Sequence, residues 1–369
     1  MNFEELYKTD LHNHLDGSIL MSTCVDIINQ QKIVTKHWTM EDIEQGKITS
    51  EFLGQIVYAR TDMKDLLEYL RAFDVTGACM QTELNLIRVV NETISNAAKS
   101  NIKHIELRYA PAFHTSTGLT QQQVQNIVAK AAKEASVQFK VSVTIIICTM
   151  KLFAPDSEIT QATFALYDQQ YPVPIAYDQA GPECMFQFTD YQKQTDAIKV
   201  PITLHAGEAA GAEAVKSAVL VGRATRVGHG VRSFESTEVM ELLRDRKIYL
   251  EMCPTSNTQT NVQGISKTLE DYPLKKYLDF GIKVTLNTDN AMISRCSVAS
   301  ELELMTQKLN LEPVDILMIT NFGFEAAFNP NAEEKEKLRE EAFKWNVKCL
   351  SKYDPEVEKK FCERMKLFQ

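Results

Sequence analysis

Short runs of apolar and β-branched residues recur along the chain, and most of them are followed by segments in which apolar side chains have helical spacing. Several of these runs are apolar at nearly every position, which is typical of parallel strands covered on both faces. The pattern predicts eight strands, at residues 6–12, 104–110, 141–148, 173–178, 201–206, 224–229, 247–253 and 282–289. From the third strand to the seventh they are spaced by roughly 23 to 30 residues, as in successive β–α units.

Eight strands that alternate with helices predict an α/β fold, a (β/α)8 TIM barrel. Such a barrel needs about 250 residues, so a chain of 369 residues leaves room for insertions. The largest predicted insertion, residues 17–103, has helical periodicity and follows the first strand. A long segment there leaves the barrel at its catalytic face, so we expect it to act as a lid. Its residues Phe52, Leu53 and Val57 could either wall the site or pack inside the insertion.

The rest of the chain is predicted to belong to the same unit. The C-terminal portion is helical, and Asn331 followed by Glu334 resembles a capping box at the start of a long helix. Because no flexible linker or low-complexity tract interrupts the sequence, we expect residues 1–369 to form one domain.

Composition and charge exclude several classes of protein. Hydrophobic residues make up 44% of the chain and charged residues 24%, as in a globular protein with a sizeable core. The net charge of −9 argues against a nucleic-acid-binding protein, and every apolar run is far shorter than the roughly 20 residues of a membrane-spanning helix. We see no signal peptide, and the eight dispersed cysteines form no CxxC pair. We therefore expect reduced thiols and a cytoplasmic protein.

Polar side chains gather where the predicted strands end, which is where a barrel of this kind carries its catalytic residues. The side chains at or just after those ends are His12, His14, Asp178, His205, Glu208, His229, Asp289 and Asn290. Four of the seven histidines therefore meet at one rim of the predicted barrel. The other three, His37, His104 and His114, are interpreted as structural or loop residues.

Imidazoles grouped with a carboxylate are ligands for a borderline divalent metal, and zinc is the usual one. His12 and His14 are two residues apart, so in an extended strand both side chains point to the same face. Glu208 follows His205 closely and is placed to move a proton. Asp289 could accept a proton from a metal-activated water, with His229 as its electrostatic partner.

Six motifs stand in the order and spacing of the adenosine deaminase family, within the amidohydrolase superfamily of metal-dependent barrels. They are DLHNHLDGS, YDQAGPE, LHAGE, RVGHG, CPTSN and LNTDN. With HIELRYAP at the second strand, the resemblance covers essentially the whole chain. A lone HxH would be a weak signal, whereas the ordered set of six is specific, so the sequence is identified as a member of this family.

The resemblance implies hydrolysis of adenosine, and of 2′-deoxyadenosine, to inosine and ammonia in purine salvage, with one Zn²⁺ per chain. The residues that resemble the family's zinc ligands are His12, His14, His205 and Asp289. Glu208 resembles the acid that protonates purine N1 and makes C6 electrophilic. His229 and Asp289 resemble the pair that orients and deprotonates the attacking water.

The resemblance also implies the contacts with the substrate, a small purine nucleoside. Gly181 resembles the glycine whose backbone N–H meets purine N3, and a glycine permits that close approach. Asp16 resembles the carboxylate that accepts the ribose 5′-hydroxyl, and His14 is expected beside the substrate. Asn290 stands where many members have a second Asp. A neutral amide donates a hydrogen bond to purine N7 without any pKa shift, so the substitution is compatible with deamination but bears on substrate preference.

Other activities remain open at this point. The substrate could be another 6-aminopurine nucleoside, such as aminodeoxyfutalosine or a modified adenosine, or free adenine. The adenine-acting branch typically has Glu where this chain has Asp16, which favours a nucleoside. The fourth strand ends in Asp178 rather than the bridging Lys of binuclear relatives, which favours one metal ion. A catalytically inactive nucleoside-binding protein should have lost a ligand or the acid, and all are present in the sequence.

Overall fold

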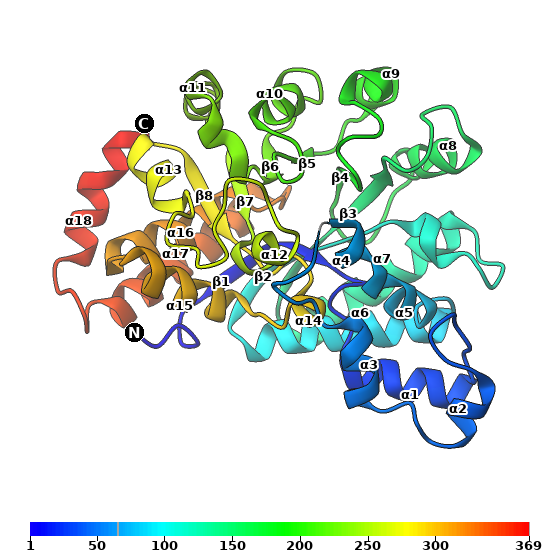
Figure 1. Ribbon diagram of the computed structural model, residues 1–369. Helices are drawn as coiled ribbons and strands as arrows, with labels where there is room; N and C mark the ends of the chain where they lie inside the picture. Colours follow the sequence, from blue (N-terminus) through cyan, green and yellow to red (C-terminus); the bar gives the residue numbers. More distant parts are fainter. Residues whose placement is uncertain (65, 369) are drawn as a thin grey trace.

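The computed structural model describes residues 1–64 and 66–368 and shows parallel strands surrounded by helices (Figure 1). Within these residues the strands are β1 (Lys8–His14), β2 (Ile102–Tyr109), β3 (Ser142–Met150), β4 (Ile175–Ala180), β5 (Thr203–Ala206), β6 (Arg226–His229), β7 (Tyr249–Met252) and β8 (Lys283–Leu286). They form two parallel sheets, in the orders β1-β2-β3-β4 and β5-β6-β7-β8. The parallel bridges Tyr177–Ile202 and Asn13–Asp289 join the two sheets at both edges, so the barrel is closed.

The predicted α/β barrel is confirmed, and each predicted strand overlaps an observed one. The first strand was predicted at residues 6–12 but lies at residues 8–14. The polar His-Asn-His segment stays in the sheet because Asn13 pairs with Leu107 and His14 with Arg108 on β2. The last strand is shorter than predicted, since the chain turns away before Asp289, whose φ of 59° lies in the left-handed region.

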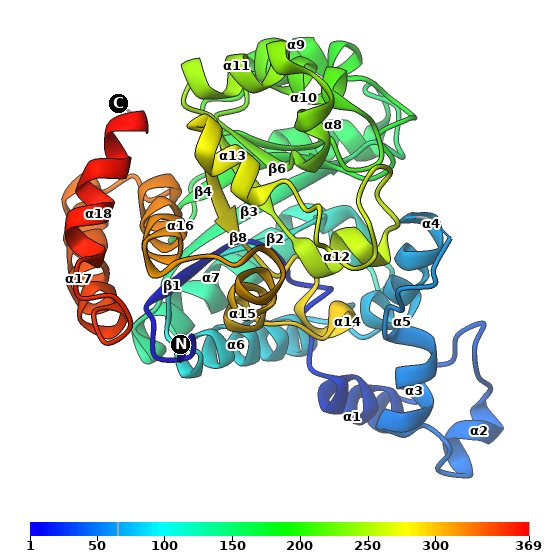
Figure 2. The same cartoon turned by 60° about the vertical axis from the view of Figure 1, so that its left-hand side comes forward.

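The segment after β1 is helical, as its periodicity predicted. It contains α1 (Met21–Gln31), α2 (Met40–Glu44), α3 (Ser50–Val57), α4 (Leu66–Tyr69), the 3₁₀ turn η1 (Leu70–Ala72), α5 (Phe73–Ala78) and α6 (Glu83–Lys99). Helices α1, α2 and α3 extend to one side of the barrel (Figures 1 and 2). Helix α6 packs against β2 and α7, so it belongs to the regular ring of helices and the inserted part ends before it.

The remaining helices cover the outside of the barrel and close its far end. They are α7 (Gln121–Phe139), α8 (Glu158–Phe164), α9 (Gln192–Ala197), α10 (Ala212–Leu220), α11 (Thr237–Asp245), α12 (Pro254–Gln259), α13 (Leu274–Phe280), α14 (Ala291–Ser294), α15 (Val298–Leu309), α16 (Pro313–Ala326), α17 (Ala332–Leu350) and α18 (Val357–Arg364). Helix α16 packs on β1 and β8, and α17 packs on α16. Asn331 caps α17 by accepting the N–H of Glu334 at 3.0 Å, which is half of the predicted capping box; its own N–H donates to Asn329 Oδ1 instead of to Glu334.

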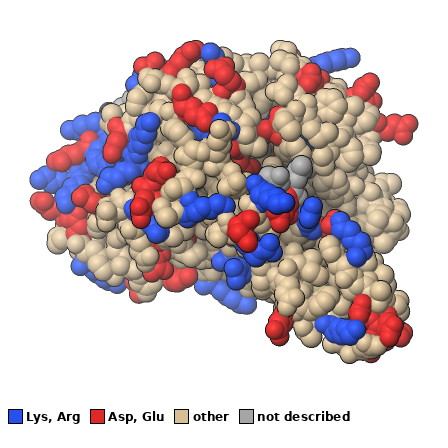
Figure 3. Space-filling view, in the orientation of Figure 1, with Lys and Arg blue, Asp and Glu red and all other residues tan. Residues whose placement is uncertain are grey.

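On the face shown in Figure 3, acidic and basic side chains are interspersed, rather than gathered into one extended positive surface. Among the described residues, no helix combines the length and the apolar character needed to cross a membrane.

The inside of the barrel holds paired charges in addition to aliphatic side chains. Arg226 donates from Nε to Glu251 Oε1 at 2.7 Å and from its terminal nitrogens to both carboxylate oxygens of Glu106. Arg108 donates to Glu251 Oε2 at 2.7 Å and to Asp178 Oδ2 at 3.1 Å. All five side chains are buried, so each charge depends on its partners for compensation. This buried charge network joins β2, β4, β6 and β7 beneath the catalytic face.

We predict that Glu106→Ala strongly destabilises the fold. The substitution removes the acceptor of Arg226 and of the Phe328 N–H, and leaves Glu251 as the remaining acid beside Arg226. Breaking a buried charge pair on one side costs about 3–5 kcal/mol, so the free energy of unfolding in urea should fall by roughly 3 kcal/mol. Glu238→Ala, at an exposed ion pair, is the control and should leave the unfolding midpoint nearly unchanged. Equal midpoints for both variants would contradict the prediction.

Candidate active site

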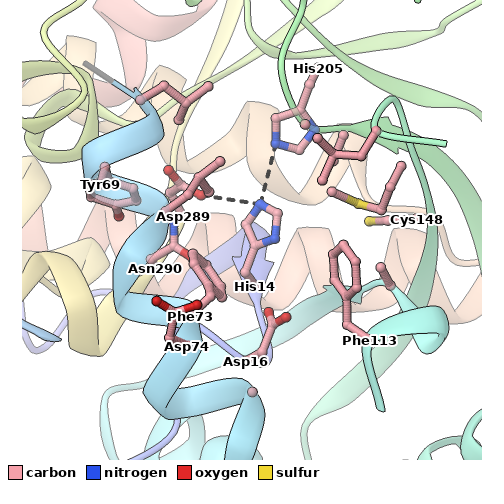
Figure 4. A pocket seen from close by; sticks show the side chains of 18 of the residues that line it. His14, Asp16, Tyr69, Phe73, Asp74, Phe113, Cys148, His205, Asp289 and Asn290 are labelled. Carbon is pink, nitrogen blue, oxygen red and sulfur yellow. Dashed lines mark hydrogen bonds and ion pairs between the residues drawn. The ribbon is translucent and has the colours of Figure 1, made fainter. Parts of the chain in front are cut away.

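A cavity of about 570 Å³ opens where the strands end (Figure 4). His14 from β1, Gly181 after β4, His205 from β5 and His229 from β6 line it, together with Asp289 after β8. The carboxyl ends of parallel barrel strands meet at the same rim, so residues far apart in the sequence come together there. Of the predicted strand-end residues, His12 and Asp178 are fully buried behind this lining, and the others line the cavity.

Four potential metal ligands converge below this cavity. His205 Nε2 lies 3.1 Å from His12 Nε2 and 3.3 Å from His14 Nε2. Asp289 Oδ1 lies 3.3 Å from His14 Nε2 and 3.6 Å from His12 Nε2. A tetrahedron with metal–ligand bonds of about 2.0–2.1 Å has edges of about 3.3–3.4 Å. Four of the six donor–donor distances are therefore close to those expected for side chains that share one divalent ion.

Closure of the barrel places Asp289 between the two histidines of β1. The N–H of Asp289 donates to His12 O and the N–H of His14 donates to Asp289 O, each at 2.7 Å. Asp289 adopts a left-handed backbone conformation, with φ of 59°, which is uncommon for a residue other than glycine. The carboxylate is thus held against the imidazoles by main-chain hydrogen bonds between the first strand and the end of the last.

Two buried carboxylates orient the imidazoles toward the centre. Glu251 Oε2 lies 2.9 Å from His12 Nδ1, and Asp178 Oδ2 lies 2.8 Å from His205 Nδ1. Each Nδ1–H can donate to its carboxylate, which leaves the Nε2 lone pair free for a metal. Burial lowers the pKa of both His12 and His14, so these rings are neutral. Burial also lowers the pKa of His205, but the charge of Asp178 more than offsets this and raises it overall.

Glu208 and His229 lie beside the four ligands in ionisation states suited to proton transfer. Burial, reinforced by the charge of Glu183, raises the pKa of Glu208 to about 7, so this carboxyl can hold a proton near neutral pH. Burial lowers the pKa of His229 to about 4, which keeps the ring neutral. Glu208 Oε2 lies 3.6 Å from His229 Nε2, and Thr260 Oγ1 donates to Glu208 Oε1 at 2.9 Å.

The CPTSN motif, which the sequence placed on the rim without a role, supports three site residues through helix α12. Ser256 Oγ donates to Asp289 Oδ2 at 2.5 Å. Asn257 Nδ2 lies 3.1 Å from His229 Nδ1, and Thr260, one residue beyond the end of α12, binds Glu208. Each contact comes from a buried side chain, so the start of α12 is a rigid support behind the site.

The predicted substrate contacts line the same cavity as His14. Asp16 is buried at its edge, and burial raises the pKa of this carboxyl to about 7. Gly181 has a φ of 98°, a conformation that favours glycine, and its lack of a side chain leaves the backbone open to a ligand. Asn290 packs against Gly17, where an added Cβ would lie 1.9 Å from the amide Oδ1. The amide oxygen therefore faces Gly17, and its nitrogen is left for the cavity.

The apolar wall of the cavity comes from the inserted segment and from loops that the sequence did not single out. Its side chains are Leu66, Tyr69, Leu70 and Phe73 from α4, η1 and α5, and Phe113, Met150 and Leu152 from after β2 and the end of β3. Two roles were left open for Phe52, Leu53 and Val57, and the structure supports packing inside the insertion rather than lining the cavity. Leu53 and Val57 are fully buried in the core, Phe52 packs against it, and none of the three lines this cavity.

Several supporting residues were missed by reading the sequence. Glu183 accepts the backbone N–H groups of Gly207, Glu208 and Ala209, at 2.7 to 2.9 Å, and so holds the loop that carries the acid. A single acidic residue inside an apolar strand, as Glu251 is, was a signal that could have been read. His104 bonds with Ser142 and a neighbouring glutamate at the start of β2, in agreement with its structural interpretation.

Comparisons with known proteins match this geometry. The model of the adenosine deaminase family matches residues 7–345. An adenosine deaminase from Enterococcus faecalis is 32% identical over 334 residues, which cover 90% of this chain and 94% of the relative. One from Haemophilus ducreyi is 33% identical over 340 residues, with coverage of 89% and 94%.

Solved structures share the fold at lower identity. An adenine deaminase from Arthrobacter aurescens has a TM-score of 0.78 at 22% identity, covering 92% of this chain and 98% of that one. An Arabidopsis N6-mAMP deaminase gives 0.77 at 21%, with the same coverage. A zinc-bound amidohydrolase from Burkholderia ambifaria gives 0.78 at 19%, covering 95% and 93%. With its barrel, its convergent strand ends and a family match along nearly its whole length, the chain belongs to the adenosine deaminase family and is a hydrolytic deaminase.

Proposed function

We propose that the protein is a zinc-dependent adenosine deaminase, which converts adenosine and 2′-deoxyadenosine to inosine and ammonia in purine salvage. The observation that carries the proposal is the meeting of two features in one cavity. One is a set of imidazole and carboxylate donors, four pairs of which are 3.1 to 3.6 Å apart, and the other is the buried carboxyl of Glu208, whose pKa is raised to about 7. The first can hold a metal ion, and the second can deliver a proton to a purine nitrogen.

In this proposal one zinc ion is held by His12, His14, His205 and Asp289. Two observations support the fit: four pairs of the donor atoms are 3.1 to 3.6 Å apart, and buried carboxylates lie beside the Nδ1 atoms of His12 and His205, so that their Nε2 lone pairs face inward. A bound zinc ion supplies Lewis acidity, which lowers the pKa of a neighbouring water toward neutrality.

The protein's own side chains move the protons. Glu208, protonated near neutral pH, donates its proton to purine N1 and so makes C6 electrophilic. Asp289 accepts a proton from the water that adds to C6, and His229 orients that water. Asp289 passes that proton to the C6 amine, the C6–N bond breaks and ammonia leaves. The C6 hydroxyl loses its proton to become the carbonyl of inosine, and this second proton of the water restores Glu208. Because Glu208 is buried, its proton is directed to the substrate rather than lost to solvent.

The remaining site residues hold the nucleoside. The backbone N–H of Gly181 meets purine N3, and Asn290 Nδ2 donates to N7, as the packing of its Oδ1 against Gly17 allows. Asp16 accepts the ribose 5′-hydroxyl; its Oδ1 is buried without a partner among the described residues. His14, which lines the cavity, packs beside the ligand.

The charge of the cavity favours a nucleoside over a nucleotide. None of the described residues that line the cavity is a Lys or Arg. Its acidic lining consists of Asp16, Asp74, Glu183, Glu208 and Asp289. Burial leaves Asp16 and Glu208 only partly ionised near neutral pH, but a 5′-phosphate placed near Asp16 would still meet acidic side chains and no compensating Lys or Arg among the described lining residues. Two of the similar solved structures are an adenine deaminase and an N6-mAMP deaminase, but for this reason we do not propose adenine or a nucleotide as the substrate of this chain.

A bulkier 6-aminopurine nucleoside, such as aminodeoxyfutalosine or a modified adenosine, is the second candidate. The observation that favours it is the open, apolar mouth of the cavity. Phe113 and Leu152 line that mouth and are 39% and 41% exposed, so an apolar substituent could cover them.

We predict that the zinc-loaded protein deaminates adenosine with a kcat/KM at least 100-fold above that for AMP or for adenine. AMP should fail because its phosphate meets the acidic lining, and adenine because it leaves Asp16 without a hydroxyl partner. The rates with adenosine, AMP and adenine are measured by the loss of absorbance at the adenine band. Aminodeoxyfutalosine is tested under the same conditions. Comparable rates for AMP and adenosine would contradict the charge argument, and no rate with any substrate would overturn the proposed function.

We predict that Glu208→Gln lowers kcat by about 10²- to 10⁴-fold, because the amide cannot transfer a proton to N1. In the native protein kcat/KM should fall as pH rises above about 7, since the active form of Glu208 is the protonated one. Thr260→Val is a matched variant. It removes a hydrogen bond that favours the charged carboxylate, so this alkaline limb should move to higher pH. A limb that does not move would argue against Glu208 as its origin.

We predict that Glu251→Gln weakens zinc binding by about 10- to 100-fold. The amide no longer accepts the Nδ1–H of His12 as a carboxylate does, so the ring is less basic and less well oriented. Competition with a chromophoric chelator measures the affinity, and wild-type protein should bind one zinc ion per chain. Glu301→Gln makes the same change at a buried glutamate bonded to Thr255, and should keep wild-type affinity. Equal affinities for the two variants would contradict the assigned role of Glu251.

A further inference from the structure

Asn257 lies in contact with two of the residues proposed to move protons. It belongs to α12, is fully buried, and places Nδ2 at 3.1 Å from His229 Nδ1 and 3.5 Å from Glu208 Oε1. On its other side, the hydroxyl of Tyr272 lies 2.8 Å from Oδ1. One amide therefore connects the acid, the histidine and a buried tyrosine.

The surroundings decide which way this amide points. If oxygen and nitrogen were exchanged, Oδ1 would face Glu208 Oε1, the carboxyl oxygen that already accepts from Thr260 Oγ1, and two acceptors would be opposed in a buried place. Burial raises the pKa of Tyr272 well above its ordinary value, so the hydroxyl keeps its proton and can donate it to Asn257. The amide oxygen thus faces Tyr272, and the nitrogen faces His229.

This orientation determines which nitrogen of His229 carries the proton. The amide N–H donates to Nδ1, which must therefore offer a lone pair. A neutral imidazole has one N–H, so the proton lies on Nε2. Nε2 is directed into the site: it lies 3.6 Å from Glu208 Oε2, and the ring centroid is 4.7 Å from that of His12. The ring presents a donor, and no lone pair, to the place where the water would stand.

We propose that Asn257 is a positioning residue that fixes His229 as the Nε2–H tautomer, so that His229 donates a hydrogen bond to the attacking oxygen and the proton of that water passes to Asp289. The inference rests on the proposed deamination. It gives His229 the role of hydrogen-bond donor and Asp289 the role of proton acceptor. The oxygen forms its bond to C6 while Asp289, whose Oδ2 accepts from Ser256, takes the proton. Tyr272 supports the arrangement by holding the amide of Asn257.

Nitrogen-15 NMR of the full-length, zinc-loaded protein with labelled histidine tests the tautomer directly. The His229 signals are identified by their loss in His229→Gln, and in wild-type protein the proton should lie on Nε2. In Asn257→Asp at pH 8.5 the new carboxylate accepts where the amide donated, so the proton should move to Nδ1. With adenosine as substrate this variant should lose about 10- to 100-fold in kcat, with KM changed less than threefold. Tyr272→Phe should show the same changes to a smaller extent.

The outcomes separate this inference from the proposed function. A wild-type spectrum with the proton on Nδ1, or an Asn257→Asp variant with wild-type kcat, would overturn the role of Asn257 while leaving deamination intact. A wild-type protein without deaminase activity would overturn the function, and the NMR result would still decide the tautomer. Melting temperatures accompany each variant, and if Asn257→Asp does not fold, the wild-type spectrum and Tyr272→Phe decide the inference.

Discussion

The site depends on hydrogen bonds between buried carboxylates and the Nδ1 atoms of its imidazoles. Glu251 Oε2 is hydrogen-bonded to His12 Nδ1, Asp178 Oδ2 lies 2.8 Å from His205 Nδ1, and Arg108 donates to both carboxylates beneath them. Without these partners the rings could rotate or change tautomer, and their Nε2 lone pairs would not converge. The same carboxylates take part in the buried charge network of the barrel, so the fold and the candidate metal site share one set of interactions.

Closure of the barrel and the support of α12 complete the arrangement. The end of β8 meets β1 through main-chain hydrogen bonds, which bring Asp289 beside His12 and His14. Helix α12 then supplies a hydroxyl to Asp289 and an amide to His229. Each proposed chemical group is therefore held by a second buried side chain or by backbone, and the site has little freedom to rearrange when a ligand enters.

Periodicity was sufficient to predict the strands, because buried parallel strands are continuous apolar runs separated by helices. It placed the end of β1 two residues too early, since polar residues such as Asn13 read as a loop although they pair with β2. The candidate metal ligands were predictable because several His residues and an Asp at the ends of barrel strands indicate a shared site. The roles of Glu251 and Arg108 were not predictable: a charged residue inside an apolar strand is a visible signal, but its partners on other strands are known only from the structure.

By itself, the sequence determined the eight-stranded α/β pattern, the rim on which His12, His14, His205 and Asp289 would meet, and the family to which the motifs belong. These follow from local periodicity and from the rule that barrel strands end on one face. The tertiary structure alone decided the donor spacing of 3.1 to 3.6 Å, the apolar wall from α4 and α5, a cavity whose described lining has no Lys or Arg, and the raised pKa of Glu208, about 7. These properties depend on burial and on contacts between residues distant in sequence, which no local pattern records.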